Sequence, residues 1–167
     1  MMKSVKWLRG IAAAAILFLA GPVFADDDNG FSEHQTKRAV DTFEAASAAC
    51  ATLDPVFRVD CLRQAYSQTV RVVANASVYW EAEVALTRVN RGLYAFVREH
   101  LDRSVARVRV NGGRIKAVTP ASVPLAQQLY RDGVDRAVAA MRGASSLEVR
   151  YFEPISQALL ATKSMMQ

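Results

Sequence analysis

Residues 32–73 read SEHQTKRAVDTFEAASAACATLDPVFRVDCLRQAYSQTVRVV, and this stretch decides the fold. Apolar and small side chains recur in it at spacings of three and four residues, which is the period of one face of an α-helix. Asp54-Pro55 starts a new helix, because Asp caps free backbone N–H groups and Pro at the first helical position has none to satisfy. The stretch therefore predicts two consecutive helices. Their face residues are Val40, Phe43, Ser47 and Cys50 in the first helix, and Val59, Leu62, Tyr66, Val70 and Val73 in the second.

Cys50 and Cys61 are the two cysteines of the chain, one near the end of the first predicted helix and the other about two turns into the second. An antiparallel helical hairpin brings such positions side by side, within the spacing that a disulfide requires. We therefore predict a Cys50–Cys61 disulfide that staples the two helices. A redox-active pair is the alternative, although active dithiols are usually spaced as Cys-x-x-Cys.

Three later stretches also show helical periodicity, over residues 78–105, 119–143 and 154–166. The chain as a whole thus predicts a mainly α, compact domain of four to five helices with a disulfide-stapled N-terminal hairpin. Two short stretches remain open. Residues 107–118 form either a small β-hairpin around Asn-Gly-Gly or a helix end followed by an extended connector, and residues 147–151 form either a strand or a helical turn.

Four side chains at the centres of the apolar faces are predicted core residues: Phe43, Leu62, Leu93 and Phe96. The segment around Trp80 combines aromatic rings with carboxylates, as sugar-binding and glycosidase sites do. Glu81 and Glu83, however, are two positions apart on a helix and point about 200° away from each other, so they do not share a site. We therefore expect Trp80 to be anchored in the core, with solvated glutamates beside it.

Residues 1–25 have the three-part layout of a secretory signal peptide. A basic start precedes an apolar run and a small-residue cleavage motif: Lys3, Lys6 and Arg9, then residues 11–20, then Val23-Phe24-Ala25. The run is shorter than the roughly twenty residues that a membrane-spanning helix needs. We expect export to the periplasm or the exterior and no transmembrane segment after cleavage. A disordered tail over residues 26–31 and a single domain over residues 32–167 complete the expected organisation.

The charge of the chain is unevenly distributed. It carries 21 basic and 16 acidic residues, a formal net charge of +5, but three basic residues lie in residues 1–25, which leaves 18 against 16, or +2. This small surplus and the expected export argue against a nucleic-acid partner. Residues 88–116 hold eight basic side chains against Glu99 and Asp102, whereas residues 26–60 hold eight acidic side chains against three basic ones.

The arginine-rich stretch contains the best candidates for a binding site: Arg91, Arg98, Arg103 and Arg107. Arg91 and Arg98 are seven positions apart and Arg103 and Arg107 are four apart, which favours a basic ridge. Such a ridge suits phosphate, an anionic lipid headgroup or an acidic protein. Two alternatives stay open: a solvated face without a partner, and internal pairing with acidic residues of the first helix such as Asp41 or Glu44.

His34 and His100 belong to no metal-binding or catalytic pattern, and no Gly-x-Ser-x-Gly motif is present. The sequence predicts no catalytic residue, metal site or cofactor, and makes an enzyme the weaker expectation. It predicts an exported, non-enzymatic binding or adaptor protein of the cell envelope, whose partner is an envelope protein or an anionic envelope component. The alternative is an envelope hydrolase acting on peptidoglycan or another envelope polymer, which would place a buried carboxylate or histidine in a cleft. The oligomeric state is left open.

Overall fold

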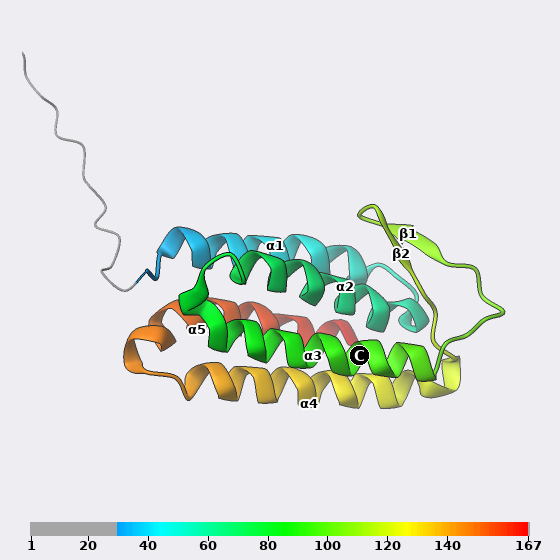
Figure 1. Ribbon diagram of the computed structural model, residues 1–167. Helices are drawn as coiled ribbons and strands as arrows, with labels where there is room; N and C mark the ends of the chain where they lie inside the picture. The colour runs from blue at the N-terminus through cyan, green and yellow to red at the C-terminus, as the bar shows by residue number, and fades with distance from the viewer. Residues whose placement is uncertain (1–29, 167) are drawn as a thin grey trace, which may run out of the picture.

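Five α-helices and one β-hairpin make up the computed structural model, which describes residues 30–166 (Figure 1). The helices are α1 (Glu33–Ala51), α2 (Pro55–Val73), α3 (Trp80–Glu99), α4 (Val123–Arg142) and α5 (Ser146–Ala161). The strands are β1 (Val108–Val110) and β2 (Gly113–Ile115), and short 3₁₀ helices span Ser77–Tyr79, Pro120–Ser122 and Thr162–Met166. The mainly α fold is confirmed, and the open choice at residues 107–118 is settled as a hairpin. The predicted signal peptide and residues 26–29 of the predicted tail lie outside the described residues.

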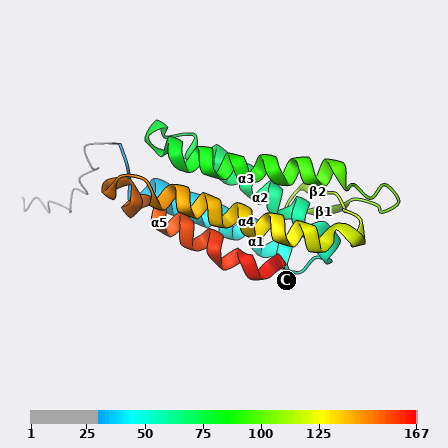
Figure 2. The same cartoon turned by 90° about the horizontal axis from the view of Figure 1, so that it is seen from below.

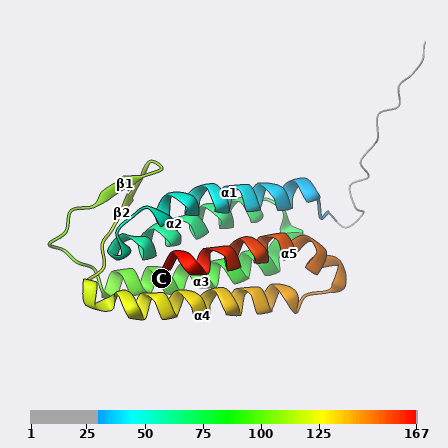
Figure 3. The ribbon, with the colours of Figure 1, turned by 180° about the vertical axis from the view of Figure 1, so that it is seen from behind.

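The helices form a closed ring around one core. Each helix packs against the next, α5 packs back against α1, and α2 also contacts α4. Figures 1 and 3 show α1 and α2 on one side of the bundle and α3, α4 and α5 on the other. The four predicted core residues are confirmed as buried: Phe43, Leu62, Leu93 and Phe96.

The first helical hairpin begins with the caps that its sequence indicates. The Ser32 hydroxyl accepts a hydrogen bond from the Gln35 backbone N–H at 3.1 Å, and the Asp54 carboxylate accepts one from Val56 N–H at 3.1 Å. The side chain of Gln35 donates to the Val72 carbonyl at 2.5 Å, so it ties the start of α1 to the end of α2. The predicted disulfide is confirmed: it joins Cys50 to Cys61, with their Cα atoms 5.6 Å apart.

Replacing Cys50 and Cys61 together by serine should lower the free energy of unfolding by about 2–3 kcal/mol, because the bond restricts the loop that the unfolded chain can open. The two residues are 11 positions apart in the chain. The helical content should remain, since both helices keep their buried faces. Urea unfolding followed by circular dichroism measures the loss, and a wild-type sample reduced with a thiol should match the double variant. A double variant as stable as the oxidised protein would contradict a stabilising role.

The hairpin is built on a two-residue turn. Val110 pairs with Gly113, so Asn111 and Gly112 form the loop, and both have positive φ angles, 47° and 75°. A type I′ hairpin turn requires positive φ angles at both loop residues, and Asn-Gly is its usual sequence for that reason. One face of the hairpin packs on α2 through buried Ile115, whereas the other face points away from the bundle.

A buried carboxylate fixes the hairpin to α2. Asp60 is 1% exposed; its two oxygens accept hydrogen bonds from Arg63 Nε at 2.6 Å and from the Lys116 backbone N–H at 2.8 Å. The Gln64 side chain adds a bond to the Arg114 carbonyl at 2.9 Å. The strands are only three residues long, so these contacts with α2 set where the hairpin sits.

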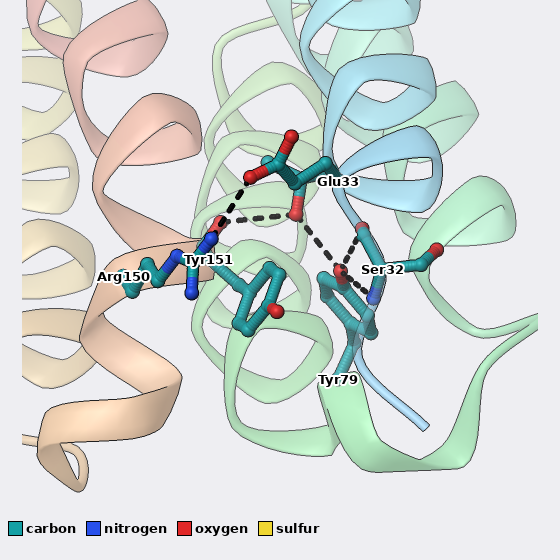
Figure 4. A network of polar contacts seen from close by, with 6 residues as sticks. Ser32, Glu33, Tyr79, Arg150 and Tyr151 are labelled. Carbon is teal, nitrogen blue, oxygen red and sulfur yellow. Dashed lines mark hydrogen bonds and ion pairs between the residues drawn. The ribbon is translucent and has the colours of Figure 1, made fainter. Parts of the chain in front are cut away.

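Polar contacts around Tyr79 join the start of α1 to α5 (Figure 4). The Tyr79 hydroxyl donates to the Ser32 carbonyl at 2.8 Å and lies 2.8 Å from the Thr36 hydroxyl, which donates to the Tyr151 carbonyl at 3.2 Å. Phe31 stacks on the Tyr151 ring with centroids 5.2 Å apart and is buried. The prediction that residues 26–31 form a disordered tail was therefore wrong at Phe31, because the Phe31 ring packs against three other aromatic rings.

The structure contradicts the prediction that Trp80 is anchored in the core. Trp80 is 57% exposed, because it lies opposite the α3 face that carries Val89, and Tyr79 is the buried aromatic residue instead.

The last helix begins at Ser146 rather than at Pro154, which lies inside it. Ser145 and Glu148 form a full capping box that starts the helix early, so residues 147–151 are helical. Val105 and Leu125 are apolar residues within the stretches of helical periodicity over 78–105 and 119–143, and both are exposed.

Candidate binding surface

The outward face of α3 carries two of the four predicted binding arginines. Arg91 and Arg98 are both exposed and lie about 10 Å apart along the helix axis. Figure 2 shows α3 along one edge of the bundle, with no other helix outside it. The opposite face of α3 is packed into the core through Leu86, Val89 and Leu93, which fixes the rotation of the helix and thus the direction of the arginines.

The loop between α3 and β1 carries the other two, Arg103 and Arg107, and both are exposed. Backbone bonds hold the base of this loop: the Asp102 N–H donates to the Ala117 carbonyl at 3.0 Å, and Thr119 N–H donates to the His100 carbonyl at 2.9 Å. The loop extends beyond the end of the helices, as Figure 1 shows. The two loop arginines thus continue the cationic surface past the end of α3.

A hollow of about 330 Å³ lies between this loop and the connector after β2. Arg103 and Arg107 line it together with Lys116. Its one carboxylate, Asp102, accepts hydrogen bonds from the Ser104 hydroxyl at 2.6 Å and from the Ser104 backbone N–H at 2.9 Å. These two bonds lower the pKa of Asp102 below its ordinary value, so the hollow combines three cations with one anion at neutral pH.

The four arginines have no partner within the described structure. Arg91, Arg98, Arg103 and Arg107, which we call the arginine surface, form no hydrogen bond or ion pair with any residue between 30 and 166. Asp41, which the sequence suggested as an internal partner, instead pairs with Lys37 at 2.7 Å, and its companion candidate Glu44 forms no ion pair with them in this part of the chain. Internal pairing with the first helix is therefore not how these four charges are compensated.

The hairpin adds a second cationic feature. Arg109 and Arg114 are exposed and stand directly opposite each other on the outward face of the two strands. Like charges in this arrangement repel each other and destabilise the pair. A bound anion would relieve that repulsion.

Two aromatic residues of α3 are exposed on the face that carries Arg91 and Arg98, which was not predicted from the sequence. Trp80 is 57% and Tyr94 is 52% exposed, and both are on α3. The Arg63 guanidinium lies over the Tyr94 ring, 5.9 Å from its centroid, and thus supports it from the α2 side. The helical period would have found both rings, because they lie 14 residues apart and therefore on the same face.

The remaining candidates for chemistry are accounted for by their surroundings. His34 is exposed, and His100 lies against the Phe96 ring with centroids 4.3 Å apart. Glu81 and Glu83 are half-buried, and their carboxylates accept no hydrogen bond from the described residues. Across residues 30–166 no group of three His, Cys, Asp or Glu side chains is arranged to hold a metal ion. No helix in that range is both long and apolar enough to cross a membrane.

No protein-family model, curated protein or solved structure gives a significant match to the chain. The functional argument therefore rests on the arrangement of its own side chains.

Proposed function

We propose that this protein is an exported, non-enzymatic binding protein of the cell envelope, and that the arginine surface holds an anionic partner. The observation that carries the proposal is that four arginines of α3 and the loop after it are exposed and have no hydrogen-bond or ion-pair partner among the described residues. The layout of residues 1–25 supports export, and the disulfide fits an oxidising compartment.

Arginine suits such a role for a chemical reason. Its planar guanidinium presents several N–H donors that match the oxygens of a carboxylate or phosphate, and it stays charged at every physiological pH. Lysine would give a point charge without this geometry. The arginine surface therefore favours a partner with carboxylate or phosphate groups.

The alternative of an envelope hydrolase has less support. Asp60 is the buried carboxylate of the described residues, and both of its oxygens are engaged with Arg63 and the Lys116 N–H. It holds the hairpin in place, which is a structural task. A general acid would need a free carboxyl oxygen directed into a cleft.

Replacing Arg91, Arg98 and Arg103 together by glutamine should abolish partner binding and leave the melting temperature within a few degrees of wild type, because these side chains form no hydrogen bond or ion pair with the described residues. A photo-crosslinking residue in place of exposed Ala95, on the same face of α3, measures binding in cells, and mass spectrometry identifies the adduct. The same probe in place of Ala45, on α1, is the control position.

A matched triple variant with lysine should keep part of the adduct, because it preserves the charge and loses only the planar geometry. Two results would contradict the proposal. One is an unchanged adduct in the glutamine variant, and the other is a large fall in its melting temperature.

A further inference from the structure

We infer that the partner of the outward face of α3 is the surface of an anionic phospholipid bilayer. This inference rests on the proposed function and names the partner class. It starts from five exposed side chains of α3 that share one face: Trp80, Val84, Arg91, Tyr94 and Arg98.

The rotation of the helix groups these side chains into a narrow stripe. At 100° per residue they fall within an arc of about 80°, and they extend over about 27 Å of helix. The glutamates of α3 lie outside the stripe: Glu81 and Glu99 are turned about 100° from Trp80, and Glu83 lies about 60° to the other side. The stripe thus contains aromatic, apolar and cationic side chains without a carboxylate.

These residue types suit the interface between water and lipid. Tryptophan and tyrosine rings are enriched at the level of the headgroups, where an apolar ring with a polar edge is partly dehydrated. Arginine contacts lipid phosphates while its carbon chain lies along the apolar region. Trp80 and Tyr94 are each more than half exposed, so they can enter such an interface without any rearrangement of the core.

The shape of the stripe favours a bilayer over a compact protein epitope. The residues that dominate protein interfaces cluster near one well-packed centre, whereas Trp80 and Arg98 lie at opposite ends of α3. The cationic line continues past the helix through Arg103 and Arg107 in the projecting loop. A long line of separate contact points fits an extended flat surface.

Trp80 gives a direct probe of this contact. The chain has two tryptophans, Trp7 and Trp80, so a full-length protein carrying Trp7→Phe reports on α3 alone. Vesicles of phosphatidylglycerol and phosphatidylethanolamine should shift its emission to shorter wavelength, and brominated lipids should quench it. Vesicles of phosphatidylcholine and inorganic phosphate should leave the emission unchanged. Because the readout is local to Trp80, attachment through residues 1–25 produces no such shift.

Charge variants separate a specific face from general attraction. In the same background, R91Q/R98Q should raise the lipid concentration at the midpoint of the emission shift about thirty-fold. Each cation near an anionic bilayer strengthens binding about five-fold, and the variant loses two of them. The control R38Q/R71Q removes two exposed arginines from α1 and α2 and should change the midpoint by less than about three-fold. High salt should abolish the shift.

Unchanged Trp80 emission with anionic vesicles would overturn the inference, and so would equal losses in the two double variants. The proposed function is tested separately, by the adduct that forms with the photo-crosslinking residue in place of Ala95. An arginine-dependent adduct with a protein, together with unresponsive Trp80, would show that the surface binds an acidic protein and not a bilayer. Absence of both signals would refute the bilayer and the binding function together.

Discussion

Phe43→Ala should lower the free energy of unfolding by about 3–5 kcal/mol, one of the two largest effects we expect from a single substitution. The Phe43 ring is fully buried between α1 and α2 and meets the Tyr66 ring edge-on, with centroids 5.0 Å apart. Truncation removes the buried ring and leaves a cavity that the surrounding helices fill only in part. Urea unfolding of wild type and variant, followed by circular dichroism, gives the difference.

Val84→Ala is the control for this measurement. Val84 is 37% exposed on α3 and does not belong to the hydrophobic core cluster, so its truncation should change the unfolding free energy by less than about 0.5 kcal/mol. A Phe43 variant that loses no more stability than the Val84 variant would show that the packing of α1 on α2 is misassigned.

Asp60→Ala should lower the unfolding free energy by about 3–5 kcal/mol and release the hairpin from α2. Asp60 is buried, and the Arg63 side chain that it pairs with is only 19% exposed. Removing the carboxylate leaves a largely buried guanidinium and the Lys116 N–H without their acceptor, which is the expensive way to break a buried pair. Amide hydrogen exchange of β1 and β2 should rise together with the loss of stability.

Asp41→Ala is the matched control, because it removes a carboxylate from an ion pair of similar length that faces water. Asp41 and Lys37 have side chains 56% and 72% exposed, and pairs of this kind contribute about 0–1 kcal/mol. Equal stability losses in the Asp41 and Asp60 variants would mean that the burial of Asp60 is unimportant. Unchanged exchange in the hairpin would mean that Asp60 does not anchor it.

The helices of this fold could be predicted from the sequence because their apolar faces repeat with a clear period. Phe43, Leu62, Leu93 and Phe96 lie at the centres of those faces, and the burial of all four follows from the period alone. The disulfide followed from its position in a helical hairpin. The Asn-Gly turn indicated the β-hairpin, although a helix end was equally compatible with it.

The errors arose where a single residue was given more weight than its neighbours. Trp80 was assigned to the core after a shared site of Glu81 and Glu83 had been rejected, whereas the phase of α3 places it in water. Pro154 was interpreted as a helix start, but the capping box at Ser145 had already begun the helix, and Pro154 lies on the exposed side of that helix. Phe31 was predicted to belong to the disordered tail because the aromatic rings that it packs against lie far from it in the sequence.

The four arginines are exposed, but Arg103 and Arg107 lie in the loop after α3, so their spacing of four does not place them on one helical face. Their partner remains a proposal. Their lack of internal pairing could not be predicted, since the sequence made Asp41 an equally suitable partner for them. Its actual partner, Lys37, lies one turn away on the same helix. Lys116 lines the hollow together with Arg103 and Arg107 because the chain returns to their loop after β2.

The closed ring of helices has a consequence for the order in which the chain can fold. Contacts between consecutive helices join residues near in sequence and form early, whereas Thr36 reaches the Tyr151 carbonyl across 115 positions of chain. The aromatic cluster around Phe31 completes itself only when α5 is present. A chain lacking its last helix therefore exposes the apolar side of α1, and protection against proteases near the amino end depends on the carboxyl end having docked.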